Sequence, residues 1–196
     1  GSNERTKMFL QRVFDGATAL GVKNIVVTEC GHAYDAMRWT SYNIMEVPEG
    51  IKITHIVGLM GEYLRSGKIK LKPGAFEGDT LTFHDACKIQ RRGGHIKEPR
   101  ELLNVMAPNS FKEMSSNREQ SVCCGGGGGV IAIKDADKNR YAAFELKIDQ
   151  MKEVGAKTVV MSCSNCRLQF VDCVQHFNLD VKVAGLSQMV ADALVD

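Results

Sequence analysis

Two kinds of hydrophobic pattern alternate along the chain. Apolar residues recur at helical spacing in residues 7–20, 54–67, 98–106, 140–154 and 165–177. Short apolar runs rich in β-branched residues lie between them, at 23–28, 80–85 and 157–162, with a further run at 180–185. The pattern predicts alternating helices and strands. This order is typical of the α/β class, with short, mainly parallel sheets flanked by helices.

Two segments resemble each other, which predicts an internal repeat. GVKNIVVTEC at 21–30 and GAKTVVMSC at 155–163 share a glycine, a lysine, three apolar residues, a hydroxyl residue and a cysteine. We therefore expect two similar half-units in a pseudo-twofold repeat, with chance similarity as the alternative. A longer stretch of the same half-unit precedes the second copy than precedes the first copy, which begins close to residue 1. We thus expect residues 1–72 to be the C-terminal part of a truncated first half-unit, and residues 73–196 to be a complete one.

Composition and charge exclude several classes of protein. The 196 residues are 44% hydrophobic and 24% charged, with a formal net charge of +2, as in an ordinary globular protein. No basic stripe indicates a nucleic-acid partner. No apolar stretch reaches the roughly 20 residues of a membrane span, and we find no signal peptide. We therefore expect a cytoplasmic protein, in which clustered cysteines more often bind metal or do redox chemistry than form disulfides.

The cysteines are spaced as for a shared metal site. The seven are Cys30, Cys87, Cys123, Cys124, Cys163, Cys166 and Cys173. Neighbouring Cα atoms lie about 3.8 Å apart, short of the roughly 4.4–6.8 Å of a relaxed disulfide, so the adjacent pair is not expected to bond to itself. Cys87 and the C-S-N-C motif follow predicted strands, and the adjacent pair follows a short segment around residues 120–122. The carboxyl edge of a parallel sheet therefore brings five thiols together.

Five sulfurs exceed the four ligands of a tetrahedral zinc or of an ordinary four-cysteine cluster. They favour an iron–sulfur assembly with an unusual ligand set. Zinc with one spare thiol, in an interaction module without catalysis, stays the alternative. A third possibility is a dithiol oxidoreductase that reacts through C-S-N-C alone, although it leaves the Cys-Cys-Gly sequence unexplained.

The spacing C-x35-C-C-G-x37-C-x-x-C, with FHDAC, EPRELL and CCGGGG around it, resembles the cysteine-rich CCG domain of the heterodisulfide-reductase family. That family includes iron–sulfur subunits of glycolate, lactate and anaerobic glycerol-3-phosphate oxidation. The resemblance implies a [4Fe-4S] cluster, of non-cubane type in the heterodisulfide reductases, and catalysis at the adjacent pair. The implied ligands are Cys87, Cys123, Cys124, Cys163 and Cys166.

The resemblance also implies a role and partners. The chain would be a fragment or subunit of an oxidoreductase that exchanges electrons with a thiol, a disulfide or a quinone-linked chain. A ferredoxin-like domain or another electron-transfer subunit would be its partner, with docking on a membrane complex despite the lack of a span. The chain departs from the family pattern because it has no upstream Cys-Cys-Gly, and Ala33 stands where a second C-x-x-C cysteine would fall. Such clusters are oxygen-labile, so an aerobic preparation is expected to lose the cluster.

Several residues around the cysteines have a functional interpretation, and for the glycines and His84 a purely structural one stands beside it. Gly125 and Gly126 would let backbone N–H groups approach the cluster sulfurs, as in an anion-binding nest, or would belong to a flexible linker. His84 would relay protons or simply pack at a strand end. His32 would line a substrate pocket, and Cys173 is expected in the core because its neighbours are apolar at helical spacing.

Overall fold

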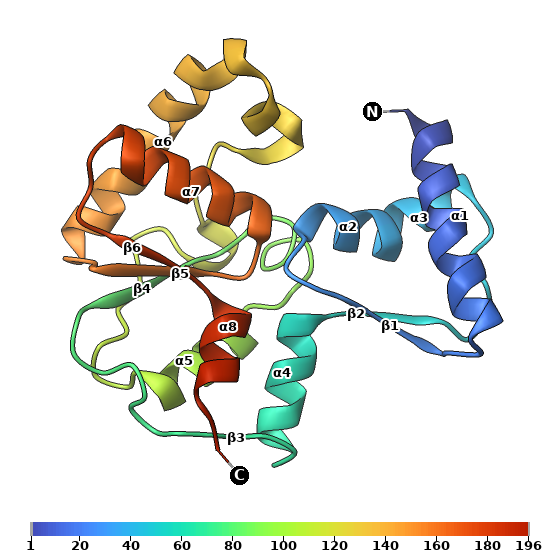
Figure 1. Cartoon of the computed structure of the whole chain (residues 1–196), viewed down its shortest axis with the longest axis horizontal. Coiled ribbons are helices and arrows are strands. Elements are labelled where there is room, and N and C mark those ends of the chain that lie inside the picture. Colours follow the sequence, from blue (N-terminus) through green and yellow to red (C-terminus); the bar gives the residue numbers. More distant parts are fainter. Residues whose placement is uncertain (1, 196) are drawn as a thin grey trace.

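Two separate parallel sheets organise the computed structural model, which describes residues 2–195 (Figure 1). In the smaller sheet, β1 (Asn24–Val27) pairs with β2 (Lys52–His55). In the larger sheet the order is β4 (Leu81–His84), β5 (Thr158–Met161) and β6 (Lys182–Gly185), all parallel. A short antiparallel pair joins β3 (Lys70–Leu71) to β7 (Leu194–Val195). The α/β class with short parallel sheets is confirmed.

Helices flank both sheets. They are α1 (Asn3–Ala19), α2 (Gly31–Asp35), α3 (Ser41–Ile44), α4 (Ile56–Arg65), α5 (Lys97–Met106), α6 (Asp137–Glu153), α7 (Ser164–His176) and α8 (Leu186–Asp192). A π-helical turn (Ala36–Thr40) links α2 to α3, and 3-10 segments lie at Arg118–Gln120, Gly127–Ala132 and Lys134–Ala136. Within residues 2–195, none of the helices combines the length and the apolar character needed to cross a bilayer.

The central strand of the larger sheet, β5, is buried on both faces, which explains its run of consecutive apolar residues. Val159 and Met161 point into a core with α6 and α7, whereas Val160 points into a second core with α4, α5 and α8. Figure 1 shows these two groups of helices on opposite sides of the sheet. The result is a three-layer α/β/α lobe around β5.

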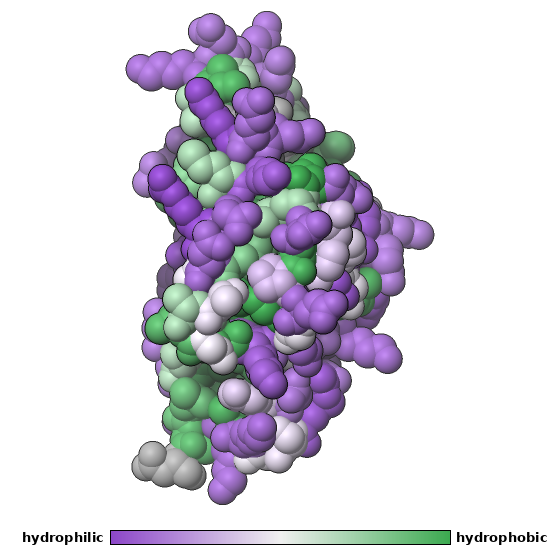
Figure 2. All heavy atoms as spheres, turned by 90° about the vertical axis from the view of Figure 1, so that its right-hand side faces the viewer, coloured by the Kyte–Doolittle hydropathy of each residue, from purple (hydrophilic) through white to green (hydrophobic). Residues whose placement is uncertain are grey.

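The smaller sheet has its own core. Leu10 and Phe14 of α1 pack with Val27 of β1, Ile53 of β2 and Tyr34 of α2. The outer surface of this lobe remains partly apolar, since Phe9 and Leu20 are exposed. Figure 2 shows the molecule from the side of this lobe, with apolar side chains scattered between polar ones.

Two predicted elements differ from the structure. The helix predicted over 54–67 begins only at Ile56, because residues 52–55 alternate in burial and pair with β1 as strand β2. The short segment predicted around residues 120–122 overlaps only the end of a 3-10 turn, and between α5 and the cysteine pair the structure adds one isolated bridge, Leu81 to Phe111. Side-chain contacts, described below, fix this loop instead.

The repeat and the boundary at residue 72 stay predictions. Both β1–β2 and β5–β6 are parallel pairs whose second strand leads directly into a helix, α4 or α8. However, α4 packs in the same core as β4 and α5, and β3 pairs with the C-terminal β7. The two predicted half-units therefore share one of their cores.

Candidate metal centre

The five motif cysteines line one small, enclosed cavity. Its volume is about 20 Å³, and it takes in Cys87, Cys123, Cys124, Cys163 and Cys166. The Sγ atoms of Cys124 and Cys166 are 3.3 Å apart. All of the cysteines are free thiols. The structure therefore brings together the five residues that the sequence singles out.

The other two cysteines lie outside the lining of this cavity. Cys173 is a buried residue of α7, and its sulfur lies 3.2 Å from the Nε2 of Gln169 in the same helix. Cys30 caps α2, since its sulfur accepts the backbone N–H of Ala33 at 3.4 Å. Cys173 is a core cysteine, as expected.

Strand ends position three of the five thiols. Cys87 follows the carboxyl end of β4, and Cys163 follows that of β5. Cys163 is also the N-cap residue of α7, and Cys166 lies in the first turn of that helix. A helix N-terminus favours negative charge, which suits a thiolate. The structure therefore places these three cysteines at the carboxyl edge of the sheet, as the sequence predicts.

Long-range contacts hold the loop that carries Cys123 and Cys124. Arg91 donates to the carbonyl groups of Glu119 and Ser121. Ser121 in turn donates through Oγ to the carbonyl of Asp85 at 3.0 Å. The cysteine pair is thereby tied to the turn that carries Cys87.

A buried ion network lies behind the same loop. Arg100, 8% exposed, binds both carboxylate oxygens of Asp85 at 2.5 and 2.7 Å and both of Glu113 at 2.9 Å. The Asp85 carboxylate also accepts the backbone N–H of Arg118 at 2.7 Å. Arg100 therefore organises the loop, and its charge is already matched by two acids.

Glycines 125 and 126 permit a close approach between the loop and two helices. Gly125 has a φ of +86°, and its N–H donates to Cys123 Sγ at 3.5 Å. A Cβ on Gly126 would lie 2.7 Å from the Cβ of Gln169 in α7. The N–H groups therefore do reach the sulfurs, while their role toward a cofactor stays a prediction.

The N-terminal lobe supplies one wall of the cavity. Gly31 and His32, at the start of α2, line it. The ring of His32 accepts the N–H of Gly128 at 3.3 Å, and the backbone N–H of Gly31 contributes to lowering the pKa of Cys163. A Cβ on Gly31 would lie 2.8 Å from the Cβ of Lys88. The thiols are thus enclosed between both lobes.

The thiols differ sharply in acidity. Hydrogen bonding with Cys124 and Cys87 holds the pKa of Cys123 far below its ordinary value. The pKa of Cys163 falls to about 5, chiefly through its hydrogen bond with Cys166 and also through nearby backbone N–H groups. Cys124 shifts the other way, to a pKa of about 12, because Cys123 is its neighbour. Two thiolates are therefore ready at neutral pH, and a bound cation would displace the remaining protons.

The surroundings of His84 indicate whether the residues of the cavity are suited to bind a metal ion or cluster. A ring nitrogen of His84 and the sulfurs of Cys124 and Cys166 all lie within 4.8 Å of one another. The ring is 1% exposed, burial lowers its pKa to about 3, and neither nitrogen has a hydrogen-bond partner within residues 2–195. Unpartnered buried polar atoms are costly. A soft thiolate set beside such a histidine fits a metal centre, either iron–sulfur or zinc.

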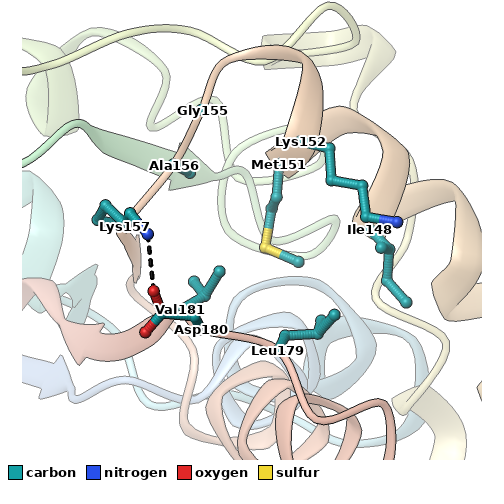
Figure 3. A pocket seen from close by; sticks show the side chains of 9 residues that line it. All are labelled: Ile148, Met151, Lys152, Gly155, Ala156, Lys157, Leu179, Asp180 and Val181. Atoms are coloured by element: carbon teal, nitrogen blue, oxygen red, sulfur yellow. Dashed lines mark hydrogen bonds and ion pairs between the residues drawn. The ribbon is translucent and has the colours of Figure 1, made fainter.

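A larger hollow lies at the other end of the sheet and is separate from this site. Its volume is about 230 Å³, and it opens at the amino ends of β5 and β6. Figure 3 shows its largely apolar lining, including Met151 and Leu179, with the ion pair of Lys157 and Asp180 (2.7 Å) on one side. The cysteines are not part of it.

Sequence reasoning missed one residue near the thiols, Lys147. A signal was available, because Phe144, Ile148 and Met151 define the apolar face of α6 and Lys147 falls on that same face. A lysine in such a position needs a buried partner.

Comparisons with known proteins agree with the cysteine pattern. Residues 81–171 match the family model of the CCG cysteine-rich domain. The chain is 25% identical to an Hdr-like menaquinol oxidoreductase iron–sulfur subunit of Archaeoglobus profundus, over 99% of this chain and 41% of that protein. It is 27% identical to one subunit of the dihydromethanophenazine:CoB–CoM heterodisulfide reductase of Methanosarcina barkeri, over 89% of this chain and 41% of that protein.

A bacterial relative shows the same kind of similarity. The probable iron–sulfur-binding oxidoreductase FadF of Bacillus subtilis is 30% identical over 74% of this chain and 19% of its own length. The chain thus spans about two fifths, 41%, of each of the two archaeal relatives. These names support an iron–sulfur cluster in the cavity. The match of residues 81–171 to the CCG cysteine-rich domain and the similarity to these subunits support the resemblance of the chain to heterodisulfide-reductase-like proteins.

Proposed function

We propose that the chain is an iron–sulfur redox domain of a heterodisulfide-reductase-like oxidoreductase. The observation that carries the proposal is the single cavity lined by five thiols from three segments. Cys87, Cys123, Cys124, Cys163 and Cys166 would hold a [4Fe-4S] cluster of cubane or non-cubane type. When bound, such a cluster supplies one-electron oxidation and reduction.

The different exposure of the two adjacent thiols indicates where a substrate would reach the site. Cys123 is exposed, whereas Cys124 is 2% exposed. A thiol or disulfide would therefore approach at the adjacent pair, from the side of Cys123, and this supports Cys123 and Cys124 as the catalytic residues. A quinone-linked carrier is the other proposed electron partner, because one relative is named as part of a menaquinol oxidoreductase.

The proposal includes the organisation and setting of the chain. Residues 73–196 would be the cluster-binding unit, and residues 1–72 the end of a related unit that closes the cavity through Gly31 and His32. Electrons would come from a ferredoxin-like domain or another subunit. The sequence has no basic stripe that would support a nucleic-acid partner. Docking on a membrane complex would take place through partner subunits. The reducing cytoplasm would keep the thiols available.

One observation favours the alternative, a zinc-stabilised structural module. A cavity of about 20 Å³ holds no more than about one water-sized sphere. A cluster of four irons needs more room, so the thiol side chains would have to rotate apart as it enters. A single zinc ion needs less movement, and His84, Cys124 and Cys166 already lie close enough to share one.

Anaerobic reconstitution with iron and sulfide tests the proposal. Wild-type protein is expected to bind about four irons and about four sulfides per chain, with an EPR signal that added thiol alters. The double variant Cys123→Ser/Cys124→Ser is expected to lose most of the iron. Cys173→Ser is the matched control, because Cys173 is a buried cysteine outside the cavity, and it should load like wild type.

Three outcomes separate the candidates. Iron and sulfide lost in the double variant but kept in Cys173→Ser support the redox domain. One tight zinc per chain and no uptake of iron would favour the structural module. Iron retained in the double variant would remove the adjacent pair from the ligand set.

A further inference from the structure

Lys147 is a charged side chain in the interior of the larger lobe. It is fully buried (0% exposed) and lies on the face of α6 that also buries Phe144, Ile148 and Met151. Phe144, Ile148 and Met151 pack in the core that contains Cys124, Cys163 and Cys166. A lysine almost never occupies such a position without a compensating charge.

The direct partners of Lys147 are neutral. Its Nζ donates to Gln150 Oε1 at 2.8 Å and lies 3.9 Å from Met114 Sδ. Met114 is itself 1% exposed and belongs to the core around the cysteines. Within the described chain, residues 2–195, no carboxylate makes an ion pair with this ammonium.

The acid whose charge acts on Lys147, Asp85, is already neutralised. Both of its oxygens bind the guanidinium of Arg100, and one also accepts the Arg118 N–H. The second acid of that network, Glu113, is held by Arg100 at 2.9 Å and also pairs with the guanidinium of Arg118 at 3.1 Å, so two cations balance the two acids. One buried positive charge therefore remains unmatched next to the cavity.

The thiols are the remaining groups that can balance this charge. Burial lowers the pKa of Lys147 to about 8, while the charge of Asp85 and the charges that Cys124, Cys123 and Cys166 carry as thiolates oppose that shift. The ammonium in turn contributes to the lowered pKa of His84, which lies against Cys124 and Cys166. Lys147 therefore lies within electrostatic reach of three candidate ligands.

We propose that Lys147 is the resident counter-charge of the metal centre: a positioning residue whose ammonium offsets the negative charge of the cysteine-bound cluster. The inference rests on the proposed function, because it requires an anionic group in the cavity. Reduction adds a negative charge to that group, and a nearby buried cation stabilises the more negative state. Lys147 therefore raises the reduction potential of the centre.

Midpoint potentials of reconstituted variants test the assignment. Redox titration followed by EPR is expected to give a more negative potential in Lys147→Met than in wild type, and a value close to wild type in Lys147→Arg. Lys152→Met is the matched control, because Lys152 is an exposed lysine of the same helix, and its potential should not change. Equal potentials in wild type and Lys147→Met would overturn the proposal.

Urea unfolding of the metal-free and reconstituted forms gives a second readout, with Lys147→Gln as the substitute if Lys147→Met fails to fold. Cluster loading should stabilise wild type more than the variant, because only wild type gains the charge pairing. A lysine with a purely structural role would shift both forms equally, so an equal gain on loading overturns the assignment. If wild type takes up no iron, the proposed function fails and the assignment fails with it. If wild type loads and the variants match it, only the assignment of Lys147 fails.

Discussion

Gly125 and Gly126 let the backbone after the cysteine pair come close to α6 and α7. At Gly125 the positive φ is unfavourable for other residues, and at Gly126 the space for a Cβ is already filled by Gln169. The next residue, Gly127, lines the cavity and has open space beside it. The structure therefore requires glycine at positions 125 and 126 more strictly than at position 127.

Gly126→Ala is expected to lower stability by about 1–3 kcal/mol, because the added methyl group would displace α7 or the loop. Iron uptake should fall as well, since Cys124 and Cys166 lie on either side of that contact. Gly127→Ala is the control and should remain within about 0.5 kcal/mol of wild type. Urea unfolding and iron counts measure both effects, and equal behaviour of the two variants would contradict the packing argument.

At the scale of elements, the strands and long helices follow from the sequence but the path of the cysteine loop does not. The apolar runs that predict β4 and β5 are local signals, and Cys87 and Cys163 follow these strands directly. The loop before Cys123 depends on contacts between distant residues, such as Arg91 with Glu119 and Asp85 with Arg118. No local pattern reveals such pairs, so the sequence does not predict the path of this loop.

Arg100→Met is expected to destabilise the protein by about 3–5 kcal/mol, because it leaves the buried Asp85 and the partly buried Glu113 without their shared cation. The loop should then loosen, and iron uptake should drop. Arg65→Met is the control: Arg65 also pairs with an acid, Glu101, but both side chains are substantially exposed. That variant should lose at most about 1 kcal/mol. Similar losses in the two variants, measured by urea unfolding, would contradict the proposed role of the network.

At the scale of the whole molecule, the sequence does not reveal that the cavity lies between two lobes. The ends of the lobes meet at His55, the last residue of β2, which is fully buried. Its ring centre lies 5.3 Å from that of Tyr34 in the N-terminal lobe and 6.0 Å from that of His95 in the loop before α5. A motif search for cysteines finds the candidate ligands but cannot place Gly31 and His32 beside them.

His55 should make stability depend on pH. Burial, with a smaller effect of His95, lowers its pKa from 6.5 to about 3, so it stays neutral in the folded state. The unfolded chain binds that proton below pH 6.5, and unfolding free energy therefore falls as pH drops from 6.5 toward 3, by about 1.4 kcal/mol per pH unit. His55→Asn keeps an acceptor for the Val57 N–H and removes the titration. Its stability should fall less steeply over this range, while exposed His176→Asn should follow wild type; parallel curves for all three would contradict this account.

The central place of β5 sets how the molecule opens. Both edges of this strand are paired, and helices cover both of its faces, so its amide hydrogens should exchange with solvent only when the whole lobe unfolds. In residues 2–195, β1 pairs on one edge only and is partly exposed, so it should exchange early. Cys163 and Cys166 follow the strand expected to exchange slowly, whereas Gly31 and His32 follow one expected to exchange early. Local opening of the cavity should therefore begin at its N-terminal wall and leave the C-x-x-C cysteines in place.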